Sequence, residues 1–285
     1  TIKNVEDIVA DDELLGPDGN PRKVISTCNG KETMYEVKQH NGDSYTVNES
    51  HILSLQQRET KKIINICVAE YIKWGKAKKS MYYGYKGKYK SEIDLNLPID
   101  PYFIGIWLGD GRTNFKRAGV QIEQLDNEVV KYLHEFAKNN GWFISKYRGG
   151  KNSKSNSYGI VGGKGRGFGN KKEIRTKNIQ HKLNKLNLNN NKHIPLIYMQ
   201  ASDKQRLELL AGLIDTDGYI DKRSGSMGIT QVNKKLSEDI LFLCRSLGLK
   251  CSINNKIVKG KKYYRIHIGG NLKNIPCKIP HKKGF

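Results

Sequence analysis

The chain has 285 residues, enough for one large domain or two ordinary domains with their own hydrophobic cores. Its 50 Lys and Arg residues against 28 Asp and Glu residues give a formal net charge of +22 that is spread along the chain, which predicts a polyanionic partner. The alternative is a soluble basic protein without such a partner. No apolar run approaches the ~20 residues of a membrane span, and the polar N-terminus is no signal peptide.

The cysteines argue against a structural metal centre. There are five of them, and they form neither a CxxC pair nor a Cys/His ligand set: Cys28, Cys67, Cys244, Cys251 and Cys277. An odd, scattered number is typical of a reducing compartment and of a protein without structural zinc. We therefore expect an intracellular location, in the nucleus or the cytoplasm depending on the host.

Residues 1–56 predict a small all-β segment. Short strand-like stretches alternate with the turn signals GPDGN and HNGD. Residues 57–97 are basic and rich in tyrosine, with lysines interleaved among Tyr82, Tyr83, Tyr85 and Tyr89. This composition suits contacts with phosphates and sugars or bases of DNA, but it suits a solvated linker between two modules equally well.

Two stretches with the same pattern follow, PYFIGIWLGDG at residues 101–111 and LLAGLIDTDGYI at residues 209–220. Each is an apolar helical run that ends in Asp-Gly, and the two aspartates, Asp110 and Asp217, are separated by an offset of 107 in the numbering (217 − 110). The first helix is expected to begin with Asp100 as N-cap and Pro101 at its first position.

Small residues recur four positions apart just before each acid. They are Gly105 and Gly109 in the first stretch, and Gly212 and Thr216 in the second. This spacing puts each pair on one helix face, where small side chains let two helix backbones approach closely. If the helices pack along these faces, the two aspartates end side by side.

Paired carboxylates at helix C-termini predict a divalent metal site. The C-terminal end of a helix carries partial negative charge, so a carboxylate there is unfavourable without a cation. Hard oxygen ligands with open positions suit Mg²⁺, with Mn²⁺ as a substitute. Two such ions can activate water and neutralise charge in phosphodiester hydrolysis.

The rest of the chain is an internal duplication. Each acid is followed by a hairpin, a helix and two more strands, and the expected helix caps, Asp126 and Asn233, lie at equal offsets from their acids (126 − 110 = 16 and 233 − 217 = 16). We expect an α+β fold in which residues 98–285 form one domain, with repeats 98–200 and 201–285 that each read αββαββ. A pseudo-twofold pair of twisted sheets would form a saddle for a DNA duplex.

Polar residues along the hairpins are candidate readers of DNA. They are Arg112, Lys116, Arg117, Gln121 and Glu123 in the first repeat, and Lys222, Arg223, Thr230 and Gln231 in the second. Alternating polar residues can equally form an ordinary wet sheet face. The glycine-rich stretch that begins at Gly162 lacks the spacing of a nucleotide-binding motif and is expected to be a basic loop facing DNA.

The two Asp-Gly stretches resemble the paired LAGLIDADG motifs of homing endonucleases. The second departs from the name-giving string at Thr216, and the first, FIGIWLGDG, is looser. The resemblance implies a monomeric enzyme that binds double-stranded DNA and cuts both strands at a specific site, with Asp110 and Asp217 as metal ligands. In intein-borne members a lysine accompanies each aspartate; the matching positions are Lys192, and Lys282 or Lys283. Asp215 is expected to be structural.

The N-terminal segment resembles an incomplete intein splicing (Hint) fold. NVEDIVADDELLGPDGNPRKV and TVNESHILSL match its first two conserved blocks, in which Thr46, Asn48 and His51 would assist the first acyl shift. Splicing needs Cys or Ser at the first position and Asn at the last, whereas this chain runs from Thr1 to Phe285. We expect no splicing from this chain, and trimming and evolutionary loss both stay open as reasons.

Two other functions remain as alternatives. One is a protein-splicing element in which the nuclease is incidental, which the residues before and after this chain would reveal. The other is a DNA or RNA binder on the same scaffold that does not cut. The presence of both aspartates disfavours this second alternative.

Overall fold

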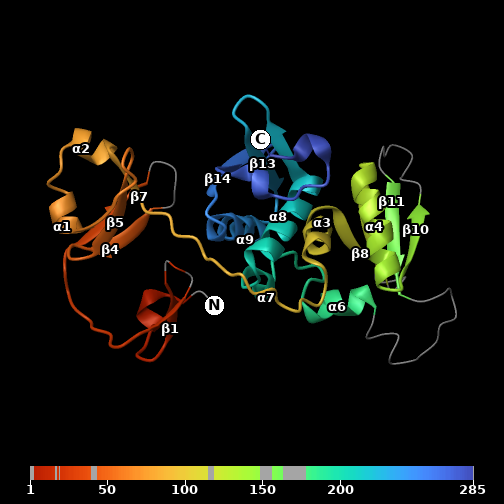
Figure 1. Ribbon diagram of the computed structural model, residues 1–285, viewed down its shortest axis with the longest axis horizontal. Helices are drawn as coiled ribbons and strands as arrows, with labels where there is room; N and C mark the ends of the chain where they lie inside the picture. Colours follow the sequence, from red (N-terminus) through yellow and green to blue (C-terminus); the bar gives the residue numbers. More distant parts are fainter. Residues whose placement is uncertain are drawn as a thin grey trace. The chain divides into compact units, whose positions relative to one another are not determined.

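The computed structural model divides into two compact units, Thr1–Tyr89 and Lys90–Phe285. The structure describes residues 3–16, 18, 20–39, 44–114, 119–147, 156–162 and 178–284. Figure 1 shows the chain coloured from red at the N-terminus to blue at the C-terminus. Within the described residues, none of the helices has the length and apolar character needed to cross a bilayer.

The first unit is built from short antiparallel strands. A 3-10 turn, η1 (Val5–Asp7), precedes a pair formed by β1 (Glu13–Leu15) and β2 (Pro21–Lys23), and a second pair formed by β3 (Met34–Val37) and β4 (Tyr45–Asn48). A three-stranded sheet follows with the order β6-β5-β7, made of β5 (Ile52–Gln57), β6 (Ile63–Cys67) and β7 (Tyr82–Gly84). Two short helices, α1 (Val68–Tyr71) and α2 (Lys76–Ser80), lie between β6 and β7 in the chain.

The sequence left residues 57–97 open between DNA contact and a solvated linker, and part of this segment forms β6, α1, α2 and β7 of the first unit. Leu53 and Leu55 alternate along β5 and form a small core with Val68. Trp74 packs between the rings of Tyr71 and Tyr82, with ring centroids 5.4 Å and 5.1 Å away. The rings and the apolar strand residues of this segment therefore belong to the small core of the first unit.

The second unit repeats one order of elements twice. The first copy comprises α3 (Pro101–Asp110), β8 (Gly111–Asn114), β9 (Gly119–Gln124), α4 (Asn127–Asn139), β10 (Phe143–Tyr147) and β11 (Asn156–Val161). The short helices α6 (Ile179–Lys185) and α7 (Leu196–Met199) lead to the second copy, which comprises α8 (Asp203–Asp217), β12 (Gly218–Asp221), β13 (Ser226–Gln231), α9 (Lys234–Ser246), β14 (Lys250–Val258) and β15 (Lys261–Gly269). The 3-10 turns η3 (Leu272–Asn274) and η4 (Pro280–Lys282) close the chain.

The two sheets have the same topology. Their strand orders are β10-β11-β9-β8 and β12-β13-β15-β14, which correspond when the copies are matched in chain order. On each sheet one face is apolar and buried, as at Val120 beside Ile160 and at Ile229 beside Ile266. The α+β fold with paired αββαββ units is therefore confirmed, and Figure 1 shows the two sheets flanking the central helices α3 and α8.

Helices α3 and α8 pack backbone against backbone through their glycines. A Cβ atom at Gly105 would lie 2.2 Å from the Leu209 oxygen, and one at Gly212 would lie 2.3 Å from the Tyr102 oxygen. Both distances are too short for any side chain. The small residues that the sequence placed on these helix faces thus make the close contact possible.

The segment before α3 is hydrogen-bonded to the first turn of α8. Ser91 and Asp203 exchange two hydrogen bonds of 2.8 Å and 2.9 Å, and Gln205 binds both the N–H and the carbonyl of Leu95. Asp100 then caps α3 by accepting a hydrogen bond from the Phe103 N–H at 3.0 Å, and Pro101 takes the first helical position, as expected.

Candidate active site

Asp110 and Asp217 are the last residues of α3 and α8, and the two helices end together. A Cβ atom at Gly109 would lie 2.1 Å from Thr216 Oγ1 and 3.3 Å from Asp217 Oδ2. The side chain of Asp217 therefore lies directly beside the residue that precedes Asp110. The structure brings the two aspartates together at the foot of the helix pair.

The site makes ionisation of both acids costly. Burial, and then the nearby charge of Asp217, raise the pKa of Asp110 to about 7, although Lys192 and Lys282 act in the opposite direction. Burial also raises the pKa of Asp217, against the hydrogen bond from Gln231 and the two lysines. A carboxylate pair in this state is stabilised by additional positive charge.

Each helix end is also contacted by one lysine. Lys192 Nζ donates to the Gly109 carbonyl at 2.8 Å, at the end of α3. Lys282 Nζ donates to the carbonyls of Ile214, Asp215 and Thr216 at 2.9–3.2 Å, at the end of α8. Both ammonium groups therefore lie at the negative ends of the helix dipoles, beside the two acids.

The chain fixes the two lysines in different ways. The α9 cap Asn233 donates from Nδ2 to the Lys192 carbonyl at 2.9 Å. The segment that carries Lys282 is held by Asp215, whose Oδ2 accepts a hydrogen bond of 2.6 Å from the Lys278 N–H. Tyr102 of α3 donates to the same oxygen at 2.6 Å, so Asp215 joins α3, α8 and the C-terminal segment.

The structure distinguishes between the two C-terminal lysines. Lys282 reaches the end of α8 and acts to lower the pKa of both aspartates, whereas the Lys283 side chain is exposed. Lys282 is therefore the second lysine of the site.

Two glutamines at matching positions behave differently. Gln231 is nearly buried and donates from Nε2 to Asp217 Oδ2, so it belongs to the acid pair rather than to an open reading face. Gln124, its counterpart in the first repeat, turns its Oε1 to the N–H groups of Leu125 and Asp126 at 2.8 Å and 3.1 Å. Its buried Nε2 has no partner among the described residues.

The residues present fit a divalent ion that is shared with a substrate. Among the described residues, no cluster of three His, Cys, Asp or Glu side chains could hold a metal on its own. Two carboxylates are nevertheless a common protein contribution to a Mg²⁺ site, since water and substrate phosphates fill the other positions. The raised pKa values of Asp110 and Asp217 mark a carboxylate pair that such an ion would stabilise.

The candidate DNA readers of the first repeat form a network across β8 and β9. Arg112 Nε donates to Gln121 Oε1 at 3.0 Å, and the Arg112 guanidinium lies 3.4 Å from Glu123. Lys116, Arg117 and the basic loop expected after Gly162 lie outside the described residues. In the second repeat, Lys222, Arg223 and Thr230 are exposed.

The sheet register adds residues that the sequence analysis missed. On β13, β15 and β14, Thr230 pairs with Arg265 and Arg265 pairs with Asn254, so the three side chains project from one face. His267 lies two residues further along β15 and shares that face. The alternation of polar and apolar residues in RIHIGG indicates that Arg265 and His267 share one face of a strand. Their partners on the neighbouring strands follow only from the pairing.

The residues of the splicing resemblance lie on and just after β4. Asn48 Nδ2 donates to Glu32 Oε2 at 2.9 Å, and the His51 N–H donates to the Asn48 carbonyl at 3.2 Å. The His51 side chain is exposed, and Thr46 pairs with Glu36 in the β3–β4 ladder. The three residues are near one another in the chain, and a catalytic arrangement stays an expectation.

Family models match both units. Residues 1–91 match the Hom_end-associated Hint model, and residues 193–277 match the Homing endonuclease model. The chain is 26% identical over 281 residues to the Replicative DNA helicase DnaB of Mycobacterium intracellulare, covering 90% of this chain and 42% of that protein. It is 27% identical over 177 residues to the Homothallic switching endonuclease of Saccharomyces cerevisiae, covering 56% of this chain and 30% of that protein. The chain thus spans less than half the length of these relatives.

Solved structures match this chain with lower sequence identity. I-DmoI in complex with DNA and Mn matches 60% of this chain and 89% of its own, with 17% identity and a TM-score of 0.40. The N-terminal LAGLIDADG domain of WhiA matches 61% and 76%, with 7% identity and a TM-score of 0.38. Residues 1–91 thus match a Hint segment and residues 193–277 a homing endonuclease segment, and these matches, with the paired motif helices, support an intein-type homing endonuclease.

Proposed function

We propose that the protein is a site-specific endonuclease that cuts both strands of duplex DNA. The observation that carries this proposal is the pair of carboxylates, Asp110 and Asp217, at the ends of two helices in backbone contact, with one lysine at each helix end. The match to the homing endonuclease model supports the reaction class, and the net charge of +22 supports a polyanionic substrate.

In this proposal the two acids hold Mg²⁺, or Mn²⁺ in its place. When bound, the ions supply an activated water and neutralise charge on the phosphate and the leaving oxygen. Lys192 and Lys282 stabilise the charge that develops on the scissile phosphate or orient water. Gln231 fixes the orientation of Asp217 through its hydrogen bond.

The outer faces of the two sheets provide the DNA contacts. Matching positions of the two repeats carry different residues: Arg112 against Tyr219, and Glu123 against Thr230. Side chains with different hydrogen-bonding groups read different base edges, so the target is expected to be imperfectly symmetric. A monomer that carries both halves in one chain suits such a target.

The test uses the full chain, Mg²⁺ and a plasmid library with randomised inserts. Linear products that require Mg²⁺ and share a sequence at the cut support the proposal. Specific binding without Mg²⁺-dependent linearisation would instead support a DNA binder that does not cut. Unchanged cutting by Asp217→Asn would rule out the proposed mechanism.

A further inference from the structure

The two lysines of the site are carried by segments outside the repeated helices and strands. Lys192 lies between α6 and α7, and Lys282 is the last residue of η4. Neither segment is part of a repeated element, so the place of each ammonium group depends on the side chains that bind the nearby backbone. One buried aspartate binds each segment: Asp239 binds the first and Asp215 binds the second.

Helix α9 holds the segment of Lys192 at two points. Asp239 Oδ2 accepts a hydrogen bond of 2.9 Å from the N–H of Ile194, two residues after the lysine. The Lys192 carbonyl accepts the hydrogen bond from Asn233 at 2.9 Å. Asp239 is only 7% exposed, and its other oxygen accepts a hydrogen bond from Lys235 at 2.8 Å. The backbone from Lys192 to Ile194 is therefore bound to α9, while the ammonium group reaches the end of α3.

The segment of Lys282 is held by α8 and by the first repeat. Asp215 is only 1% exposed, and its Oδ2 accepts hydrogen bonds of 2.6 Å from the Lys278 N–H and from Tyr102 Oη. The Lys278 ammonium group lies over the rings of Tyr102 and Tyr132, 4.7 Å and 5.1 Å from their centroids. The first repeat therefore helps to fix the segment whose lysine contacts the end of α8.

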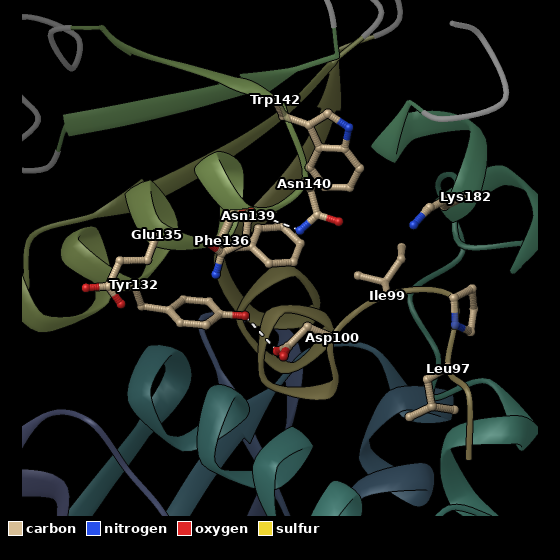
Figure 2. A pocket seen from close by; sticks show the side chains of 11 residues that line it. Leu97, Ile99, Asp100, Tyr132, Glu135, Phe136, Asn139, Asn140, Trp142 and Lys182 are labelled. Atoms are coloured by element: carbon tan, nitrogen blue, oxygen red, sulfur yellow. Dashed lines mark hydrogen bonds between the residues drawn. The ribbon is translucent and has the colours of Figure 1, made fainter. Parts of the chain in front are cut away.

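The Tyr132 ring is itself held in place by α3. Its hydroxyl donates to Asp100 Oδ1 at 2.6 Å, and Figure 2, which draws a pocket that Tyr132 lines, shows this hydrogen bond. Its ring meets the Tyr102 ring edge to face, with centroids 4.6 Å apart. Because Asp100 caps α3 and Tyr102 lies in α3, the Lys278 ammonium group contacts rings that the first motif helix positions.

Each half of the site is thus assembled by both repeats. Lys192 contacts the end of α3, in the first repeat, but its segment is bound to α9, in the second. Lys282 contacts the end of α8, in the second repeat, but its segment is bound partly to α3 and α4, in the first. A change in one repeat can therefore move the lysine at the motif helix of the other.

We propose that Asp239 and Asp215 are positioning residues, and that each controls the cutting of one DNA strand through the lysine whose segment it binds. This inference rests on the proposed function. The two lysines lie at the ends of different helices, so each acts on a different scissile phosphate. Displacing one lysine by about 1 Å lowers the rate at its own phosphate by up to about 10²-fold, while the other strand is still cut.

The rate of cutting of each strand tests the proposal. The substrate is a duplex that carries the site recovered from the plasmid library and a different fluorophore on each strand, so that a denaturing gel gives one rate per strand. Lys192→Met and Lys282→Met identify the strand that depends on each lysine. Asp239→Ala should slow the Lys192-dependent strand about 10- to 10²-fold, and Asp215→Leu should slow the Lys282-dependent strand to a similar degree. Equal slowing of both strands, or unchanged rates in the folded variants, would overturn the proposal.

Three control variants separate position from charge and from stability. Asp239→Asn keeps an oxygen that can accept from the Ile194 N–H, and it should retain most of the rate on both strands. Lys235→Met removes the ion pair of Asp239 but not its bond to Ile194, and it should change neither rate. Ser246→Ala removes a buried hydrogen bond from Arg206, at the far end of α8 from the acids, and it should lower the Tm without a difference between the strands. A strand difference in Ser246→Ala would contradict the proposal.

Lysine labelling tests the positioning in the full chain without DNA. Acetic anhydride followed by mass spectrometry reports the accessibility of each ammonium group, and both site lysines are partly buried. Asp239→Ala should increase the labelling of Lys192 but not of Lys282, and Asp215→Leu should do the reverse. Unchanged labelling of both lysines in the folded variants would overturn the proposal.

The two measurements also distinguish this inference from the proposed function. If the unmodified chain does not cut DNA, the proposed function fails, and the labelling alone decides whether the two aspartates position the lysines. If Asp215→Leu does not fold, Asp215→Asn, which keeps one of the two oxygens, should show the same selectivity for Lys282 to a smaller degree. Equal labelling of Lys192 and Lys282 in that variant would count against the proposal.

Discussion

The two repeats share the same order of helices and strands but differ in the contacts that surround each acid. Element bounds coincide for β9 with β13 and for α4 with α9 once the numbering is shifted by the offset between the two acids (217 − 110). The residue two positions before each acid differs. In α3 it is the buried Leu108, whereas in α8 it is Asp215, which binds Tyr102 and the C-terminal segment. Each repeat therefore keeps the acid and one lysine but assembles its half of the site from different contacts.

The polar contacts of the acids differ in the same way. Asp217 receives a hydrogen bond from Gln231, whereas the matching Gln124 is directed to the start of α4. The helix-end geometry is therefore common to both repeats, whereas the orientation of each carboxylate depends on its own repeat. Experiments that change one repeat at a time can separate these contributions.

The largest effect should come from removing either acid. Asp110→Asn and Asp217→Asn each remove one of the two carboxylates proposed to hold the metal. Bound metal stabilises the charge of the transition state by several kcal/mol, so the cutting rate should fall by roughly 10³-fold or more. The measurement is Mg²⁺-dependent plasmid linearisation. If one variant retains nicking of a single strand, the two halves act independently. Full activity in either variant would contradict the assigned role of that aspartate.

The lysines should have the next largest effect. Lys192→Met and Lys282→Met each remove a cation beside the acids, which should lower the cutting rate about 10²- to 10³-fold. Lys283→Met is the matched control, because Lys283 is exposed one residue further on and should leave the rate unchanged. A rate loss in the control equal to that of Lys282→Met would show that the C-terminal segment contributes only general charge.

The shared helix contact should be sensitive to a single methyl group. Gly105→Ala and Gly212→Ala place a Cβ 2.2 Å and 2.3 Å from backbone oxygens, so the helices must separate, at a cost of about 1–3 kcal/mol or more. Thermal unfolding measures this cost, and roughly 2–4 °C of Tm is lost for each kcal/mol. Gly30→Ala, with no atom within 4 Å, is the control and should leave the Tm unchanged.

The smallest effect should be a change of stability with pH in metal-free buffer. The folded state raises the pKa of Asp110 from 3.8 to about 7, so the folded chain binds an extra proton between these values. The contribution of Asp110 to stability is therefore fully present below pH 3.8 and is lost as pH rises through 7. Asp110→Asn should raise the Tm by a few °C at pH 8 in EDTA and change it less at pH 5. A lower Tm for the variant at pH 8 would contradict this reasoning.

Much of the endonuclease unit followed from sequence because its signals are local. Apolar runs that end in Asp-Gly, small residues four apart and caps at equal offsets determined both motif helices and the repeat. They also pointed to Asp110 and Asp217, since helix periodicity and the helix dipole act within one segment. Less of the first unit followed from sequence, because its strands β6 and β7 are short and the stretch between them is rich in lysine.

Contacts between distant segments could be decided only by the tertiary structure. Lys282 rather than Lys283 reaches the end of α8 because Asp215 fixes the segment that carries it, 63 residues away in the chain from Lys278. Gln231 turns to Asp217 while Gln124 does not, and α8 begins five residues earlier than α3 does when the two acids are matched (208 − 203). Sequence periodicity specifies which face of an element is buried, but the partner across that face depends on packing, which brings together residues with no shared local pattern.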